Sequence, residues 1–472
     1  MATAGATRQR TKDSRPELPE PADAVQGSPG ADAVSPPVPA KDDAPPEKKP
    51  SGFAMLLLHL HPKAVPEDAL ALPRTFGLGG ITLLLLLLLV GTGTLLLFVY
   101  DPSPEKAYAS ILTIENRVPF GGFVRAAHHW AANALIVAAF LHLLRVFFTG
   151  AYHPPRRFNW VLGLALLLLV TASNFTGYLL PWDQLSFWAV TIGTGMLAYV
   201  PLAGGAILNV LRPGGEVGAK TLSFFFVLHI ALLPILLFLF ASFHFWLVRK
   251  AGGVILPAPT EGTARRRLVS VRPNLVVREG VVALVVLAAL FLAAALFPAP
   301  LEEQANPGMS PNPAKAPWYF MGIQELLVHI HPAFAVFAVP LLVAAFLVAL
   351  PYLRYGEAPS GLWFHSPKGK RAAIGAALAA LVLTPGGVLA SEFAVHWPRL
   401  LTFLPPAASN GLLPMLLWLG IVALIFRLAG NVYGASRLEA VQAVFTFLAV
   451  SFLVLTATGT FFRGESMRLV WP

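Results

Sequence analysis

Apolar segments recur along the whole chain and are separated by short polar stretches. Each segment is close to the roughly 20 residues that an α-helix needs to cross a hydrocarbon core. The pattern therefore predicts about nine transmembrane helices and an all-α integral membrane protein. The predicted spans run at about Leu78–Tyr100, Phe123–Phe148, Phe158–Leu180, Phe224–Val248, Val277–Phe297, Ala333–Tyr352, Ala372–Leu389, Leu412–Leu428 and Ala440–Phe462.

Two of these spans each carry a pair of histidines, His128 with His142 and His229 with His244. On a helix, spacings of 14 and 15 residues correspond to about 21 Å and 22 Å of rise on nearly the same face. Each helix therefore offers one imidazole near each side of the bilayer. Ionisable side chains inside a span are costly and usually mark function. Two haems, each held by one histidine from each helix, would give all four histidines a partner.

A single histidine of this kind can also be a hydrogen-bonded residue between helices, but four histidines in two matched pairs favour haem. Two arginines on the same helix agree with this interpretation. Arg125 lies three residues before His128, and Arg145 lies three residues after His142. Residues three apart on a helix are neighbours, and a guanidinium group suits the carboxylate of a haem propionate.

The composition changes the picture in two ways. With 56% hydrophobic and 12% charged residues among 472, the chain is too apolar for an ordinary soluble protein. The net charge of +10 then reports Lys and Arg in cytoplasmic loops, and it does not indicate nucleic acid as a partner. There is no cysteine, which excludes disulfides, thiolate-bound iron-sulfur clusters and thioether-attached haem on this chain. Any such centre must belong to another subunit.

The N-terminal part differs from the rest. Residues 1–50 are rich in Pro, Ala, Asp and Lys, which predicts a disordered extension, either a solvated tail or a partner-binding arm. This stretch lacks the apolar core of a signal peptide. Residues 53–75 are amphipathic and are expected to lie along the membrane surface.

Positive charge gathers in alternate loops, at residues 156–157, 249–267, 354–371 and 427–437. Such loops face the cytoplasm, so the N-terminus is predicted to be cytoplasmic. His128 and His229 then fall towards the outer side, and His142 and His244 fall towards the cytoplasmic side. The two predicted haems are stacked across the bilayer.

Six glycines lie in the spans next to the histidine pairs. Small residues there let haem edges approach the backbone, but they also allow close helix packing, and the sequence does not separate the two. The glycines are Gly79, Gly80, Gly91, Gly93, Gly163 and Gly177.

The motifs around the histidines resemble cytochrome b of the bc and b6f complexes, and they are nearer to the b6f branch. The similar strings are Val124-Arg125-x-x-His128-x-Trp130, His142-x-x-Arg145, Gly177-Tyr178-x-Leu180-Pro181-Trp182-Asp183-Gln184, His229, and His244-Phe245 before Arg249-Lys250. The resemblance implies a b6-like four-helix di-haem domain at 51–256 and a subunit IV-like domain at 257–390. The composition adds a disordered extension at 1–50, and the hydrophobic pattern adds two further helices at 391–472. The last two spans have no counterpart that we can place.

The resemblance also implies a quinol oxidation site near the outer surface. In that family an outer loop carries Pro-Glu-Trp-Tyr, whose glutamate takes a proton from quinol. Here the matching string is Ala316-Pro317-Trp318-Tyr319, so Trp318 and Tyr319 are expected at the quinol but the acid is missing. Glu325, with His329 and His331 after it, can take the proton instead, or these residues are interfacial polar groups at the start of a span. Loss of the usual glutamate favours a low-potential quinol such as menaquinol.

Three further positions bear on cofactors. Gly77 occupies the place where the b6f branch has the cysteine that attaches an extra haem, so that haem is not expected. Phe224 replaces an arginine near the outer propionates, with Lys220 as a replacement. Arg249 and Lys250 match a basic pair that binds a quinone anion or a propionate, although they also mark the cytoplasmic end of a helix.

Together these features predict a quinol:electron-acceptor oxidoreductase subunit with two b-type haems. Quinol oxidation outside and quinone reduction inside would be coupled to proton translocation. By resemblance, the partners are a Rieske-type iron-sulfur subunit or c-type cytochrome subunits, quinone and membrane lipid, in a homodimer within a bacterial cytoplasmic membrane. Two alternatives stay open: a non-bifurcating quinol dehydrogenase that feeds a multihaem cytochrome, and a transporter or membrane anchor in which the histidines relay protons or join helices.

Overall fold

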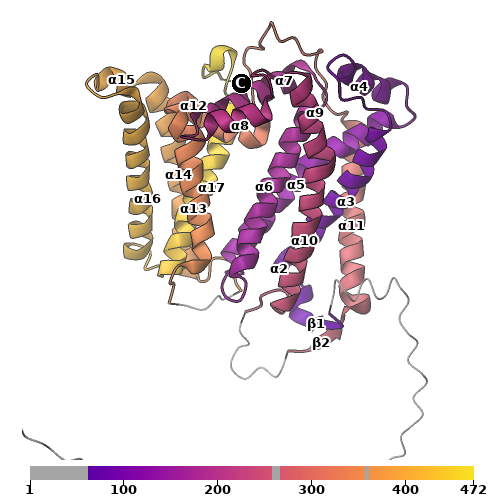
Figure 1. Cartoon of the computed structure of the whole chain (residues 1–472). Coiled ribbons are helices and arrows are strands. Elements are labelled where there is room, and N and C mark those ends of the chain that lie inside the picture. The colour runs from indigo at the N-terminus through magenta and orange to yellow at the C-terminus, as the bar shows by residue number, and fades with distance from the viewer. Residues whose placement is uncertain (1–61, 258–265, 357–360, 472) are drawn as a thin grey trace, which may run out of the picture. The chain divides into compact units, whose positions relative to one another are not determined.

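Helices make up nearly all the regular structure in residues 62–257, 266–356 and 361–471, which are the residues that the computed structural model describes (Figure 1). The predicted N-terminal extension, residues 1–50, lies outside the described residues. The start of the predicted surface segment, residues 53–61, also lies outside them. The fold class expected from the hydrophobic pattern, an all-α membrane protein, is confirmed.

In the described part of the chain, nine helices are long and apolar enough to cross a membrane. The hydrocarbon core offers no water to backbone N–H and C=O groups, so a run of apolar residues there must satisfy them within a helix. The spans are α3 (Leu78–Leu97), α5 (Gly121–Phe148), α6 (Arg157–Leu179), α9 (Ala219–Val227) with η3 (Leu228–Leu232) and α10 (Leu233–Lys250), α11 (Val271–Leu296), η5 (Ala333–Ala338) with α13 (Val339–Ala349) and η6 (Leu350–Tyr352), α14 (Pro367–Phe393), η7 (Ala408–Leu412) with α16 (Leu413–Asn431), and α17 (Arg437–Phe461).

Shorter elements join the spans. They are β1 (Ala64–Pro66), η1 (Glu67–Leu70), α2 (Leu72–Thr75), α4 (Ala107–Asn116), α7 (Gln184–Gly195), η2 (Met196–Tyr199), α8 (Gly204–Leu211), β2 (Leu268–Ser270), η4 (Trp318–Phe320), α12 (Met321–His329), α15 (Trp397–Leu400) and η8 (Glu465–Met467). Strands β1 and β2 pair antiparallel, with Ala64 opposite Ser270. The described part of the predicted surface segment is therefore β1, η1 and α2.

Capping residues explain where several helices begin. The Ser366 hydroxyl accepts hydrogen bonds from the backbone of Lys368 and Gly369 at the start of α14. Ser436 and Glu439 form a capping box at the start of α17. Each motif satisfies backbone N–H groups that have no partner within the helix. The long helices therefore start at defined residues and not at the edge of the apolar run.

Two buried clusters hold the spans together. The first joins α3, α5, α6, α10 and α11 through residues that include Leu85, Leu135, Val170, Leu237 and Leu290. The second joins α14, α16 and α17, mainly through alanines on α14 and α17. The predicted domain boundaries at residues 256 and 390 stay predictions, and apolar packing crosses both of them.

Candidate metal centres and the adjoining cavity

The four histidines of the motif form two facing pairs. His128 on α5 faces His229 in η3, with ring centroids 6.2 Å apart and ring planes at 72°. His142 on α5 faces His244 on α10, with centroids 6.4 Å apart and planes at 73°. Both pairs thus have nearly the same geometry at two levels along α5.

These separations match those of two ligands to one metal ion. A first-row metal lies about 2.0–2.1 Å from an imidazole nitrogen that binds it, and that nitrogen lies about 1.2 Å from the ring centre. Two imidazoles on opposite sides of one ion therefore have centroids about 6.4 Å apart. Among the described residues, no group of three or more His, Cys, Asp or Glu could hold a metal ion. Two facing imidazoles at this separation leave the other ligand positions of an iron ion to a group such as a porphyrin, so the residues fit haem.

A local change of helix type explains the unequal spacing of the two pairs. His229 lies in η3, a π-helical turn directly before Pro234 on α10. Pro234 has no N–H to donate to the preceding turn, and a π turn accommodates one extra residue. The 15-residue step of the second pair therefore spans the same levels as the 14-residue step of the first.

Neighbouring oxygens orient the outer pair. The Thr92 hydroxyl donates to the carbonyl oxygen of Leu88 (2.8 Å) and lies 2.9 Å from His128 Nδ1, so its oxygen is available to accept the imidazole N–H. His229 Nδ1 lies 2.9 Å from the carbonyl oxygen of Ser173 and donates to it. A proton on Nδ1 leaves Nε2 free for a metal, and such hydrogen bonds fix the ring orientation.

Four of the predicted glycines each face one of the four histidines. An added Cβ on Gly93 would lie 3.1 Å from His128 Cε1, and one on Gly177 would lie 2.9 Å from His229 Nδ1. An added Cβ on Gly79 would lie 3.6 Å from His142, and one on Gly163 would lie 3.4 Å from His244. Gly80 and Gly91 have open space around them. These four glycines therefore lie opposite the four histidines, and the space between glycine and imidazole is smallest at the outer pair.

The two arginines expected at haem propionates bind protein groups in this structure. Arg125 is buried, pairs with Glu115 and donates to the carbonyl oxygens of Ala299 (3.0 Å) and Pro300 (2.7 Å). Arg145 is also buried, and its Nε donates to the carbonyl oxygen of Arg74 (3.0 Å). These acceptors could not be predicted from the sequence, because all except Glu115 lie far along the chain from the arginine that they bind.

The basic pair at the end of α10 is exposed. Lys250 Nζ lies over the Trp246 ring, 5.0 Å from its centroid. A cation in this position is attracted by the face of the ring. Arg249 lies next to it at the same helix end, so both charges stay near the predicted cytoplasmic surface.

A cavity of about 1110 Å³ adjoins the outer histidine pair. It is lined by both His128 and His229, and also by Trp318, Tyr319 and Tyr178. This volume exceeds the roughly 300–1,000 Å³ of an ordinary small-molecule site. The structure thus brings the predicted Trp318 and Tyr319 into one space with the outer pair.

Polar groups of this cavity include several that sequence reasoning did not assign. The Trp318 indole N–H donates to Asn133 Oδ1 (2.6 Å), which links η4 to α5. The Tyr319 hydroxyl is buried and has no hydrogen-bond partner among the described residues. Asp183 and Glu302 also line the cavity. Two sequence signals could have identified these residues as part of the site. Asp183 belongs to the Pro-Trp-Asp-Gln string, and Glu302 lies in the predicted outer loop.

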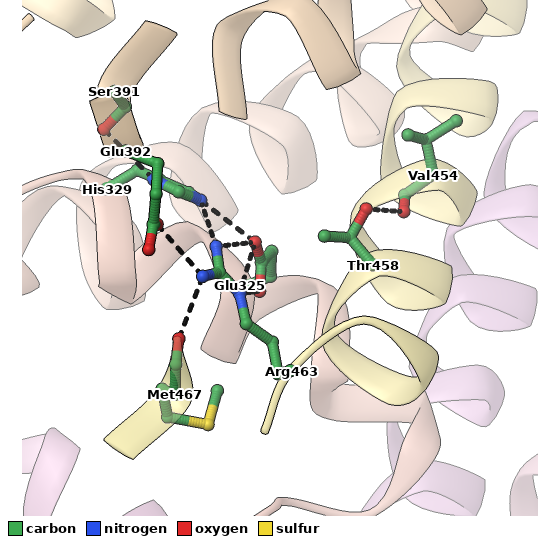
Figure 2. A network of polar contacts seen from close by, with 8 residues as sticks. All are labelled: Glu325, His329, Ser391, Glu392, Val454, Thr458, Arg463 and Met467. Carbon is green, nitrogen blue, oxygen red and sulfur yellow. Dashed lines mark hydrogen bonds and ion pairs between the residues drawn. The ribbon is translucent and has the colours of Figure 1, made fainter. Parts of the chain in front are cut away.

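Glu325 does not lie where the sequence led us to expect it. It is absent from the residues that line the cavity and is fully buried in an ion pair with Arg463, whose Nη2 lies 2.6 Å from Oε1 (Figure 2). His329 Nε2 lies 3.0 Å from the same oxygen. Burial alone would raise the pKa of Glu325, but hydrogen bonds with His329 and Arg463 and the guanidinium charge hold this pKa below its ordinary value. The structure therefore argues against a direct proton-accepting role for Glu325.

His329 and His331 also lie outside the cavity lining. His329 Nδ1 lies 3.1 Å from the Ser391 hydroxyl, at the end of α14. His331 donates its backbone N–H to the carbonyl oxygen of Asn410 (2.8 Å). His329 through its side chain and His331 through its backbone thus contact neighbouring elements. Their part in taking a proton stays a prediction.

Comparison with known proteins agrees with this geometry. The family model described as Cytochrome b/b6/petB matches residues 66–252. The chain is 44% identical to Cytochrome b6 of Heliomicrobium gestii over 177 residues, which are 38% of this chain and 83% of that protein. It is 38% identical to the Cytochrome bc complex cytochrome b subunit of Chlorobaculum thiosulfatiphilum over 272 residues, which are 57% of this chain and 62% of that protein.

A solved structure named Hyperthermophilic respiratory Complex III has a similar fold, with a TM-score of 0.62 and 22% sequence identity. The likeness covers 86% of this chain and 97% of that chain. Both the sequence relatives and the histidine geometry point to one group of membrane proteins. The chain belongs to the cytochrome b/b6 family.

Proposed function

We propose that this chain is the di-haem cytochrome b subunit of a bc-type quinol oxidoreductase. The observation that carries the proposal is the matched geometry of the two imidazole pairs, with centroids 6.2 Å and 6.4 Å apart. His128 with His229 and His142 with His244 would each hold one b-type haem. When bound, the haems would supply one-electron transfer between the two sides of the membrane.

The chain's own residues prepare each centre before a haem binds. Thr92 and the Ser173 carbonyl oxygen orient the outer imidazoles through their Nδ1 atoms. The facing glycines leave room beside each imidazole ring. Because these groups are fixed by packing within helices, little reorganisation is needed when the charge of the centre changes.

The cavity beside the outer pair is the proposed quinol site. The buried Tyr319 hydroxyl lacks a partner among the described residues and is positioned to hydrogen-bond a quinol oxygen. Burial, with a contribution from Tyr178, raises the pKa of Tyr319, so the hydroxyl stays a neutral donor. Trp318 forms part of the wall and is held by Asn133. An orphaned polar atom in a mostly apolar cavity is the kind of group that orients a ligand.

Glu302 replaces Glu325 as the proposed proton acceptor. Partial burial raises the pKa of Glu302, and the nearby carboxylates of Asp183 and Glu303 raise it further. A base with a pKa closer to the working pH is better matched to proton transfer. Glu302 also borders an open surface depression with Tyr108 and Gln184, which gives the proton a route to the outer solution.

The two electrons of quinol are proposed to take different paths. One electron from quinol leaves to an iron-sulfur or c-type cytochrome subunit, because this chain has no cysteine to hold such a centre. The haems that the two histidine pairs would hold would supply the path of the second electron, and Arg249 and Lys250 would bind the quinone that is reduced. The complex is a dimer in a bacterial cytoplasmic membrane, with its N-terminus in the cytoplasm. Proton release outside and uptake inside generate a transmembrane gradient.

A redox titration of the purified complex, with haem quantified per chain, tests the proposal. Two b-type haems with separate potentials are expected, together with quinol-dependent reduction of an external cytochrome. One haem or none would refute the assignment. Low potentials would identify the quinol as a low-potential one such as menaquinol. Transfer of both quinol electrons to the external acceptor, without reduction of the inner haem, would show a non-bifurcating enzyme.

A further inference from the structure

The last helix, α17, is the most buried of the nine spans in the described part of the chain. In its most apolar stretch 44% of the residues are buried, against 11% to 39% in the other spans. It packs against α14, α16, α12 and η4. A helix at the margin of a membrane protein faces lipid over much of its surface, so this burial marks α17 as an internal element.

The inner half of α17 is fixed to α5, the helix that carries the inner histidine His142. Val441 and Phe445 pack in one buried cluster with Phe147 and Phe148 at the end of α5. The Gln442 side chain donates to the carbonyl oxygen of Phe148 (3.2 Å). Because α5 also carries both His128 and His142, this contact sets the position of α17 relative to the metal centres.

The outer half of α17 approaches the backbone of α12 through two glycines. An added Cβ on Gly322 of α12 would lie 2.6 Å from the Phe452 ring and 2.9 Å from the Thr456 hydroxyl. An added Cβ on Gly459 of α17 would lie 2.8 Å from Met321 Cε and 3.2 Å from the Met321 carbonyl oxygen. Neither position has room for a larger residue. The turn η4, with Trp318 and Tyr319, directly precedes this contact.

Beyond α17, Arg463 joins three elements with its buried guanidinium group. Nε and Nη2 donate to Glu325 on α12, at 2.9 Å from Oε2 and 2.6 Å from Oε1. Nη1 donates to Glu392 on α14 (3.0 Å) and to the carbonyl oxygen of Met467 (2.9 Å), and Nη2 also lies 3.1 Å from His329 Nε2 (Figure 2). Four of the five N–H donors of the group thus bind oxygen atoms of these three elements.

The same C-terminal segment holds the loop that leads into η4. Lys315 Nζ donates to the carbonyl oxygen of Thr460 (2.9 Å), and the backbone N–H of Ser466 donates to Asn312 Oδ1 (2.5 Å). From α12, Gln324 Oε1 accepts the backbone N–H of Ala316 (2.6 Å). The residues on both sides of Trp318 and Tyr319 are therefore tied to α17 and its extension.

We propose that α17 and Arg463 position the Trp318–Tyr319 wall of the outer cavity, and that Arg463 is a positioning residue for quinol oxidation. The inference rests on the proposed function. A fully buried ion pair adds little net stability compared with a well-packed apolar pair, but its fixed contacts define where α12 lies relative to α5. The last span is therefore part of the quinol site.

Two variants should disturb, in different ways, the contacts by which α17 and Arg463 hold the Trp318–Tyr319 wall in place. Gly322→Ala keeps every charge but places a Cβ 2.6 Å from the Phe452 ring, so the ring, or α12 relative to α17, must move by close to 1 Å. The double variant Glu325→Gln with Arg463→Gln removes the Glu325–Arg463 ion pair together, and of the charged partners it leaves only the partly exposed Glu392 without Arg463. Two control variants change similar residues without these contacts. Gly420→Ala on α16 meets open space, and Arg468→Gln changes an exposed arginine five residues after Arg463.

The first measurement is quinol oxidation by the purified complex, with a short-chain quinol and rates expressed per haem. A displacement of about 1 Å near a reaction centre can cost about 10²-fold, so we expect kcat/KM to fall by about 10²-fold in Gly322→Ala and by about tenfold or more in the double variant. Two haems per chain and an unchanged inner-haem potential should remain. Values of kcat/KM per haem within twofold of wild type would overturn the proposal, and so would a loss of activity that only parallels a loss of haem.

A second measurement does not depend on quinol chemistry. Because the chain has no cysteine, a single Ala316→Cys gives one thiol beside Trp318 whose maleimide labelling rate reports the packing of the segment. We expect about tenfold faster labelling when the double variant is added, and an unchanged rate with Arg468→Gln. Equal rates in all backgrounds would overturn the positioning role. A wild-type complex that does not oxidise quinol would instead refute the proposed function, while the labelling result would still decide the positioning.

Discussion

Gly177→Ala tests the outer metal centre directly. An alanine Cβ at this position would lie 2.9 Å from Nδ1 and 3.0 Å from Nε2 of His229. Ordinary van der Waals contact begins at 3.4 Å, so the ring or α6 must move by at least about 0.5 Å. Metal-ligand distances tolerate only about 0.2 Å of error. We therefore expect the outer haem to be lost while the inner haem remains.

Haem quantified per chain in the purified variant is the assay, followed by an optical redox titration. The expected result is a fall from two haems to about one per chain, with one remaining potential. Gly163→Ala is a matched control because its Cβ would lie 3.4 Å from His244, and it should keep both haems. Gly91→Ala, which meets open space on α3, should do the same. A Gly177→Ala protein with two haems and unchanged potentials would refute the role of this glycine.

Three further predictions concern single side chains. His142→Ala should remove the inner haem and spare the outer one, and two haems by optical titration would contradict the ligand assignment. Glu325→Gln leaves the buried Arg463 with Glu392 as its remaining carboxylate partner, and it should lower the free energy of unfolding by about 3 kcal/mol, measured by thermal denaturation. An unchanged melting temperature would count against the ion pair. Glu302 accepts a proton only when ionised, so its raised pKa means that turnover should fall as pH falls through that pKa. Glu302→Gln should lower turnover by about 10²-fold and flatten this acid limb, and a wild-type pH profile in the variant would exclude Glu302.

Features with a regular period could be predicted from the sequence. Apolar runs of bilayer length gave all nine spans, and the histidine spacing predicted two facing pairs because helical rise is constant. The glycines opposite the histidines were also visible, although their contacts were not. The π turn at His229 was missed, yet its signals were present in the 15-residue step and in Pro234.

Contacts between distant residues could not be predicted. Glu325 and Arg463 are 138 residues apart, and nothing local to Glu325 shows that its carboxylate is already bound. Arg125 likewise binds the carbonyl oxygens of Ala299 and Pro300, which any sequence could offer. The sequence therefore shows which side chains are charged. It does not show which partner neutralises each charge, because that depends on how the helices pack.

The buried pair of Glu325 and Arg463 also has a consequence for biosynthesis. A ribosome adds about 5–20 residues per second, so the 138 residues between the two take about 7–28 s to make. During that time the four histidines are already synthesised, but the carboxylate on α12 has no guanidinium to receive it. The two histidine pairs can therefore form before Arg463 ties α12 in place, and the contacts around Trp318 and Tyr319 are completed only when α17 and the segment after it have been made.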